Sequence, residues 1–201
     1  MKKFCFLISL LLLSPAILYA QSFTPENIPE DVYYLLPSFA NGTIYFSDRA
    51  PAKVLMNICA WDQTLRFIDR NDNELRLANE DNITLVQIDS VSFRRINKEY
   101  YRVIPVTSNI GIAVKRRFIY HDKPQNTTGA IVQKKGEYKL SDFDFEAYDE
   151  MAIYRGDNVY PVTQKSLRIL FPSKKREISS YYTMPKTEEG LKTLLTWLAK
   201  E

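Results

Sequence analysis

The stretch from Gly42 to Pro105 is a run of short apolar segments, each closed by a polar turn, and this pattern constrains the fold most strongly. Apolar side chains alternate in Thr43 to Ser47, and Ile83 to Phe93 is dense in β-branched residues. The tetrad Arg70-Asn71-Asp72-Asn73 is rich in residues that tolerate turn geometry. Strands at this spacing predict an antiparallel meander, which can close as a sandwich, a barrel or a bent sheet.

The sheet is predicted to continue beyond this stretch. Ile110 to His121 has the composition of one or two strands, and Ala130 to Leu140 and Met151 to Val162 indicate a further pair. Gly156-Asp157-Asn158 marks a hairpin turn. The β-rich body is therefore predicted to span residues 42–162.

The apolar period becomes helical after Thr163, which is placed as an N-cap, as are Ser173 and Thr187. The last predicted helix carries an amphipathic stripe at i, i+3, i+4 and i+7, formed by Leu191, Leu194, Leu195 and Leu198. The fold class is thus α+β and mostly β, with two or three short C-terminal helices, residues 163–201, packed on the body. The same stripe can pack on a partner, although packing within the chain is commoner.

The N-terminal residues have the pattern of a secretory signal peptide, residues 1–20. Lys2-Lys3 precedes the apolar run Phe4 to Leu13, and Leu18-Tyr19-Ala20 ends in a small residue suited to cleavage. Because Gln21 rather than cysteine follows the cleavage point, we expect an exported protein, periplasmic or extracellular, that is not a lipoprotein and has no transmembrane span after cleavage. Residues 21–41 form a proline-containing lead-in segment.

Charge and cysteine content argue against a nucleic-acid-binding protein and against a fold held together by disulfides. The net charge of +3 would fall to about +1 on loss of Lys2 and Lys3, which is no electrostatic footprint for nucleic acid. Cleavage would also remove Cys5 and leave Cys59 alone. A single cysteine forms no disulfide within its own chain, so stability is expected to come from a hydrophobic core that includes this thiol.

The sequence holds no specific catalytic signature. Cys59 and His121 are the sole conceivable nucleophile and base, but nothing places them together, and the chain has one histidine. The acids of Ser141 to Glu150 are candidates for a hydrolytic carboxylate pair, with Asp144 and Glu146 as the residues to test, although alternating acids are typical of the solvated side of a strand. We expect no enzyme activity and no cofactor.

The loop from Asp69 to Glu80 partly matches a calcium-binding loop. Asp69, Asn71, Asn73 and Glu80 occupy positions 1, 3, 5 and 12 of that pattern. Position 6 requires glycine but holds Glu74. The loop is therefore predicted to be a polar hairpin turn, and cation binding remains the alternative.

Two basic clusters, Lys115-Arg116-Arg117 and Lys174-Lys175-Arg176, are candidates for contact with anionic lipid or glycan. Such runs more often form solvated surfaces, particularly at the end of a helix. The sequence leaves both interpretations open.

Aromatic residues make up 13% of the chain, and some occur as adjacent pairs. Because neighbouring residues of a strand face opposite sides, one member of each pair can be exposed and bind a partner. The alternative, which we favour, is that core covers one side and the C-terminal helices the other. The candidate surface comprises Trp61, Tyr100, Tyr101, Tyr181 and Tyr182.

The opening G-T-I-Y-F, a following L-x-F-x-D strand and the segment LRILFPSKKREISSYY before a final amphipathic helix resemble uncharacterised exported β-rich proteins of Bacteroidota. The resemblance covers most of the mature chain and implies export and a β-rich body with a helical tail. It implies no activity and no functional residues. Export, the absence of catalytic signatures and the surplus of aromatic residues favour a non-enzymatic envelope protein that binds another protein or part of the envelope. The alternatives are a glycan-binding module and, less favoured, a carboxylate-dependent hydrolase.

Overall fold

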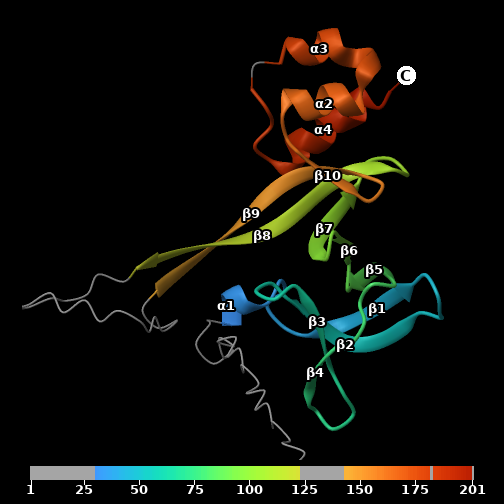
Figure 1. The fold of residues 1–201 in the computed structure, drawn as a ribbon, viewed down its shortest axis with the longest axis vertical. Coiled ribbons are helices and arrows are strands. Elements are labelled where there is room, and N and C mark those ends of the chain that lie inside the picture. Colours follow the sequence, from blue (N-terminus) through green and yellow to red (C-terminus); the bar gives the residue numbers. More distant parts are fainter. Residues whose placement is uncertain (1–29, 123–142, 182, 201) are drawn as a thin grey trace, which may run out of the picture.

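The computed structural model describes residues 30–122, 143–181 and 183–200, and it consists of one antiparallel sheet of ten strands with three short helices near the C-terminus (Figure 1). This confirms the predicted α+β, mostly β, fold class. The predicted signal peptide, the part of the predicted lead-in before residue 30 and the predicted strand Ala130 to Leu140 lie outside the described residues. No helix in the described part of the chain is long and apolar enough to cross a membrane.

The strands are, in chain order, β1 Ala40–Phe46, β2 Ala52–Cys59, β3 Thr64–Ile68, β4 Glu74–Arg76, β5 Ile83–Ile88, β6 Val91–Ile96, β7 Glu99–Pro105, β8 Ile110–Asp122, β9 Phe143–Arg155 and β10 Asn158–Pro161. The helices are the single turn α1 Glu30–Tyr33, then α2 Gln164–Leu170, the 3-10 turn η3 Pro172–Lys174, α3 Lys175–Ser179 and α4 Glu188–Leu198.

The strand order is β10-β9-β8-β7-β6-β5-β1-β2-β3-β4, so two meanders meet where β5 pairs with β1. The segment Ile83 to Phe93 forms two strands, β5 and β6, which are joined by a turn at Asp89 and Ser90. Asp89, at the turn between them, has a φ of 50°, which a short aspartate side chain tolerates in a tight hairpin.

The sheet curls strongly between β3 and β7. Neighbouring strands lie about 4.8 Å apart, so a flat sheet would separate these two strands by roughly 24 Å. Instead the backbone N–H of Tyr100, on β7, donates to Gln63 Oε1 in the β2–β3 turn at 2.7 Å. Glu80, in the loop before β5, accepts from Leu65 N of β3 at 2.9 Å and from the Tyr100 hydroxyl at 3.1 Å. The bent-sheet alternative is therefore the correct closure.

One hydrophobic core fills the inside of this curl. It contains side chains that pair across neighbouring strands and therefore share one side of the sheet, such as Ile44 with Val86 and Ile58 with Leu65. Phe93 and Tyr100, which are 2% and 1% exposed, close it from β6 and β7.

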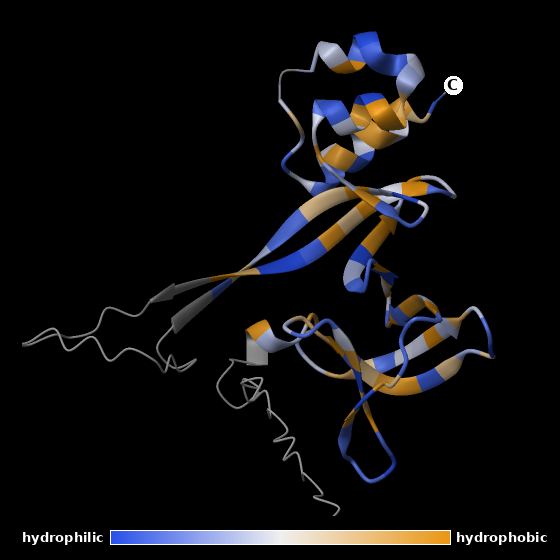
Figure 2. Ribbon diagram, viewed as in Figure 1, coloured by the Kyte–Doolittle hydropathy of each residue, from blue (hydrophilic) through white to orange (hydrophobic). Residues whose placement is uncertain are grey.

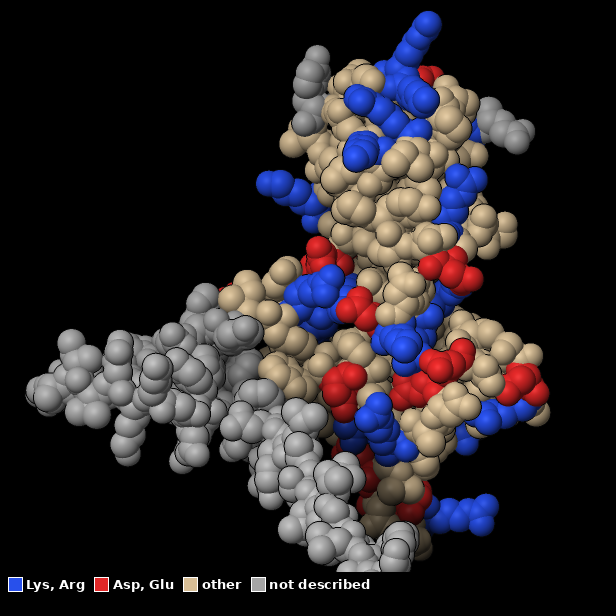
Figure 3. All heavy atoms as spheres, viewed as in Figure 1, with Lys and Arg blue, Asp and Glu red and all other residues tan. Residues whose placement is uncertain are grey.

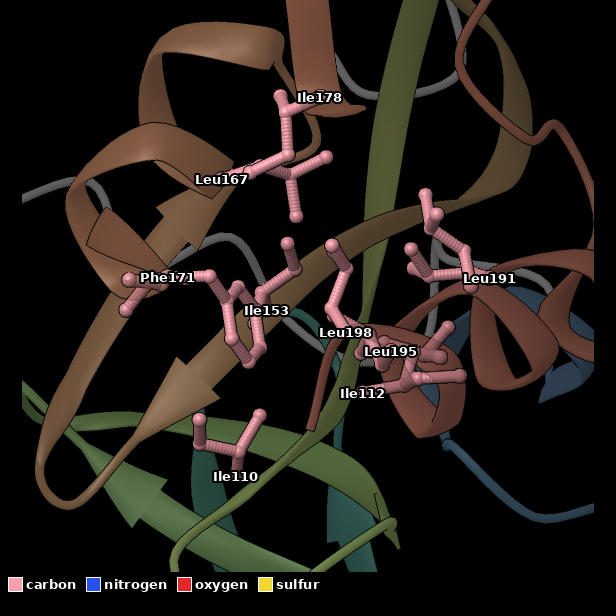
Figure 4. Close-up of a cluster of buried hydrophobic side chains, with 12 residues drawn as sticks. Ile110, Ile112, Ile153, Leu167, Phe171, Ile178, Leu191, Leu195 and Leu198 are labelled. Atoms are coloured by element: carbon pink, nitrogen blue, oxygen red, sulfur yellow. The ribbon is translucent and has the colours of Figure 1, made fainter. Parts of the chain in front are cut away.

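A second core lies between β8, β9 and the C-terminal helices (Figure 4). Ile112 of β8 pairs with Ile153 of β9, and the helices bring their apolar sides onto this pair. Figure 2 shows hydrophobic residues on α2 and α4 and mainly hydrophilic ones along α3. The leucine stripe of α4 thus packs on the chain's own sheet. The helical side chains of this core are Leu167, Leu170, Phe171, Ile178, Leu191, Leu194, Leu195 and Leu198.

The lead-in joins β2 through a buried asparagine. Tyr34 forms a bridge with Cys59 at the end of β2, so the predicted alternatives of helical turn and docking strand both occur, one after the other. The Asn57 amide donates to Leu36 O at 2.9 Å and to Ser38 O at 3.1 Å, and its oxygen accepts from Leu36 N at 3.2 Å. These bonds satisfy backbone groups where the chain enters β1.

Strands β8 and β9 extend beyond their other neighbours as a two-stranded hairpin arm, Lys115–Asp122 with Phe143–Met151. The acidic segment therefore belongs to a strand rather than to a connection between strands. On one side of the arm, Phe118 and Ala147 pack against the buried cluster of Val32, Tyr33 and Cys59. The lead-in helix α1 thus supports the arm.

Candidate functional site: a cationic helical cap

Residues Thr163 to Lys200, which we call the helical cap, owe their shape to local signals in the sequence. Thr163 caps α2 by accepting from Ser166 N at 3.1 Å, and Thr187 caps α4 by accepting from Gly190 N at 3.2 Å. Pro172 follows α2 and begins the 3-10 turn η3, since proline removes a backbone donor needed to continue a helix. These stops fold three short helices back over β8 and β9.

The cap carries an excess of positive charge that the sheet does not share. It contains eight lysines and arginines but only three glutamates. Residues 30–122 and 143–162 together contain thirteen cationic residues and seventeen acidic ones. Figure 3 shows basic side chains gathered over the upper part of the molecule, where Figure 1 places the cap. The cationic residues are Lys165, Arg168, Lys174, Lys175, Arg176, Lys186, Lys192 and Lys200.

The basic side chains of the sheet mostly have acidic partners. The predicted cluster Lys115-Arg116-Arg117 is of this kind: Lys115 pairs with Glu99, and Arg116 and Arg117 pair across the arm with Asp149 at 3.2 Å and Glu150 at 2.7 Å. This cluster is therefore neutralised within the sheet. The other ion-paired cations of the sheet are Arg66, Arg94, Arg95 and Arg102.

The eight cations of the cap behave differently. Within the described residues none of them forms an ion pair with a carboxylate, and the single pair that involves the cap joins its Glu188 to Arg102 of β7. That pair also consumes one of the cap's few acids. Lys174-Lys175-Arg176 thus belongs to a surface whose charge is not balanced by the fold.

Exposed apolar side chains accompany these charges. Tyr181 and Trp197 are 37% and 41% exposed, and their ring centroids lie 6.0 Å apart with a 45° tilt. The Gln164 amide donates to the backbone oxygen of Tyr181 and holds that segment against α2. Of the predicted aromatic surface, Tyr181 is exposed, and Tyr182 lies outside the described residues. Sequence reasoning missed Trp197, although its position outside the leucine stripe of α4 is a signal for exposure.

The other predicted aromatic residues do not form an exposed surface. Tyr100 and Tyr101 are 1% and 8% exposed, because the two sides of β7 at this point are both covered. The Tyr101 hydroxyl donates to Glu99 at 2.9 Å, and burial raises the pKa of Tyr101 to about 12. Trp61 is half-buried and lies 5.8 Å from the Phe118 ring. We expected the C-terminal helices to cover the second side of these strands. Tyr101 is instead covered by other residues of the sheet.

The conceivable nucleophile Cys59 has the wrong environment for catalysis. Its thiol is fully buried, and burial raises its pKa to about 11, which disfavours the reactive thiolate. Asp62 N donates to its sulfur at 3.5 Å. His121 lies near the far end of β8, where it pairs through the backbone with Asp144, and its side chain lies outside the described part of the structure.

The residues that match the calcium-loop pattern form hydrogen bonds within the fold. Asp69 Oδ1 accepts from Asn71 N at 2.8 Å and from Asn73 N at 2.9 Å, which is the geometry of a polar turn before β4. Glu80 is 7% exposed and is held by Leu65 and Tyr100 inside the curled sheet. No cluster of three or more His, Cys, Asp or Glu residues suited to a metal occurs among the described residues.

Among the acids of β9 whose side chains the structure describes, Glu146, Asp149 and Glu150, no two are arranged along the strand as a hydrolytic pair. Asp149 and Glu150 are neighbours on one strand, so they face opposite sides. Glu146 and Glu150 share a side, but four residues of strand separate them by roughly 13 Å, whereas glycoside hydrolysis uses carboxyl groups about 5 to 10 Å apart. The side chains of Asp142 and Asp144 lie outside the described part.

The cap is therefore a part of the described molecule in which cations without ion-pair partners and exposed aromatic side chains coincide. It offers hydrogen-bond donors and apolar contact area, which are the properties of a surface that binds an anionic partner. Compared with models of known protein families, with curated proteins and with solved structures, the chain matches none of them.

Proposed function

We propose that this chain is an exported, non-enzymatic binding protein, periplasmic or extracellular, and that its helical cap binds an anionic partner in the cell envelope. The observation that carries the proposal is the contrast between the two parts of the molecule. Seven of the thirteen cations in residues 30–122 and 143–162 have carboxylate partners, whereas the eight cations of the cap have none among the described residues.

Uncompensated charge at one end of a molecule attracts partners of opposite sign. Exposed like charges repel one another and weaken the fold slightly, and a partner that supplies carboxylates or phosphates removes this cost. The attraction acts over about 8 Å at physiological ionic strength. A protein exported from the cytoplasm meets its anionic partners in the envelope, which makes nucleic acid a poor candidate.

Photo-crosslinking in intact native cells tests the proposal. A photoreactive amino acid is placed at Lys192 on the outer side of α4, and in a control strain at Lys53, an exposed cation of β2. We expect a reproducible adduct from position 192, an acidic partner within it, and a much weaker adduct from position 53. Equal adducts from both positions, or none from either, would reject the cap as the binding surface.

Glycan binding is the second candidate, and the Tyr181–Trp197 pair favours it, because exposed aromatic rings stack on sugars at low entropic cost. A glycan panel probed with the purified protein and with Trp197→Ala separates the two functions. Glycan binding that Trp197→Ala abolishes and that resists salt would favour this candidate. Failure to bind any glycan would eliminate it.

A further inference from the structure

A pocket of about 570 Å³ lies at the end of the cap, where the β7–β8 turn meets the C-terminal ends of α2 and α4. Its volume is in the range of small-molecule sites. Its apolar lining comes from four mostly buried residues: Ile110, Leu170, Phe171 and Leu198.

The polar lining of this pocket is cationic. Arg155, Lys174 and Lys200 line it together with Thr107, Asn109 and Ser173, and no Asp or Glu does so among the described residues. None of the three cations has an ion-pair partner in the described part of the chain. A concave site with an apolar wall and three unpaired cations is complementary to a molecule that is anionic at one end and apolar at the other.

Arg155 is positioned before any ligand arrives. Its Nη1 donates to the Leu170 backbone oxygen at 2.9 Å, at the end of α2, which fixes the guanidinium beside the pocket. One of its five N–H groups is used in this bond, so the others remain for an anion. Pre-positioned donors lose little conformational entropy on binding, and guanidinium bonds to carboxylate or phosphate are stronger than neutral hydrogen bonds.

A simpler role for these cations is to offset the negative ends of two helix dipoles. The Arg155–Leu170 bond fills that role for α2. It does not account for the coincidence of two further lysines with a hollow that has an apolar wall. A helix end needs one cation beside its last carbonyls and needs no cavity.

We propose that this pocket binds an amphiphilic organic anion, with a carboxylate or phosphate head group at Arg155 and Lys174 and an apolar chain against Leu198 and Phe171. The inference rests on the proposed anion binding by the cap and names the chemical class of its ligand. Lipid-derived and free organic anions share this chemistry.

Calorimetric titration of the purified exported protein tests the pocket with four probes. Octanoate and octyl phosphate combine an anionic head with a chain, inorganic phosphate supplies charge alone, and octyl glucoside supplies a chain alone. We expect octanoate or octyl phosphate to bind at least about tenfold more tightly than the last two, because both halves of the pocket are then used. The tighter of the two anionic amphiphiles identifies the head group. Equal binding of octyl glucoside would overturn the proposal.

Two matched variants locate the site. Arg155→Gln/Lys174→Gln removes two cations that line the pocket, and Lys53→Gln/Lys98→Gln removes two exposed cations of the sheet. The first is expected to weaken binding of the preferred probe about tenfold or more and the second less than about twofold. Unchanged binding in the first variant would overturn the pocket while leaving anion binding by the cap intact, and failure of the wild type to bind any anion or anionic envelope would reject both.

Backbone NMR provides a readout that does not depend on the variants. On titration with octanoate, the amide signals expected to shift are those of Asn109, Ser173 and Lys200, which line the pocket. The amide of Lys192, on the outer side of α4, is the internal control. Shifts centred on Lys192 instead would contradict the assignment.

Discussion

Glu80 is the residue that holds the curled sheet together. Its carboxylate accepts from β3 and from the Tyr100 hydroxyl, and Arg95 Nε lies 3.3 Å from it. Burial raises its pKa in spite of these partners. Its contacts span 15 residues to Leu65 and 20 to Tyr100, so no local pattern in the sequence indicates them. Sequence reasoning could place Glu80 in a polar loop but could not predict that the loop folds inward.

The raised pKa of Glu80 predicts a pH dependence of stability. The folded protein binds this proton more tightly than the unfolded chain, so the contribution of Glu80 is fully present below the unfolded pKa of about 4.3 and is lost as pH rises through the folded pKa. Glu80→Gln keeps an acceptor for Leu65 but cannot ionise. We expect the unfolding free energy of this variant, relative to wild type, to increase from pH 4 upward by roughly 1.4 kcal/mol for each unit of the pKa shift.

Urea unfolding at a series of pH values measures this difference. Asp81→Asn is the matched control for charge, since Asp81 is an exposed neighbour that also pairs with Arg95, at 2.9 Å. A free-energy difference between Glu80→Gln and wild type that stays constant across the series would contradict the inferred environment of Glu80.

Asn57 is the second residue whose role depends on distant backbone. It is fully buried and bonds three backbone groups of Leu36 and Ser38. Asn57→Leu keeps the size but leaves these groups without partners, and we expect a loss of about 2 to 4 kcal/mol of unfolding free energy. Denaturant unfolding measures it. A loss below about 0.5 kcal/mol would mean that the lead-in is not held by this side chain.

At the scale of elements, turn chemistry made much of the sheet predictable. Asp72, Asn79 and Asn97 all have positive φ and occur at the turns that close strands, where the sequence places polar residues. The hairpin turn at Gly156 is confirmed as well, with a φ of 57°. The sequence predicts a strand at Ile110 to His121, which is β8, but not its pairing in the hairpin arm, because the arginine partners of the arm's acids are 33 residues away.

We predict that the stability of the hairpin arm depends on its contact with the lead-in. A two-stranded hairpin is marginally stable alone, so its contact with α1 and Trp61 through Phe118 should hold it. We expect Phe118→Ala to cost about 1 to 3 kcal/mol and to speed hydrogen exchange in the arm. Ile119→Ala is the matched control, since Ile119 is 41% exposed and faces the other side of the strand. Similar exchange rates in both variants would show that α1 does not support the arm.

At the scale of the whole molecule, charge is unevenly distributed: the cap has an excess of cations, and residues 30–122 and 143–162 have a small excess of acids. Figure 3 shows basic side chains over the cap and both kinds below it. Net charge alone conceals this, because the two parts largely cancel. The helices and their leucine stripe were predictable from their period. The closure of the sheet and the lack of partners for the cap's cations were not, because both depend on which strands and side chains meet in space.

The most direct test of the central claim is salt-dependent binding of the purified protein to isolated native envelopes, measured by co-sedimentation. Two variants remove four exposed, unpaired cations each: Lys165→Gln/Lys175→Gln/Arg176→Gln/Lys192→Gln in the cap, and Lys53→Gln/Arg70→Gln/Arg76→Gln/Lys98→Gln in the sheet.

We expect the wild type to sediment with the envelopes and to be released at about 1 M salt, where screening shortens the electrostatic range to about 3 Å. The cap variant is expected to lose most of its binding, while the sheet variant keeps it. An equal loss of binding in the two variants, or binding that does not change with salt concentration, would contradict the account of the cap as the binding surface.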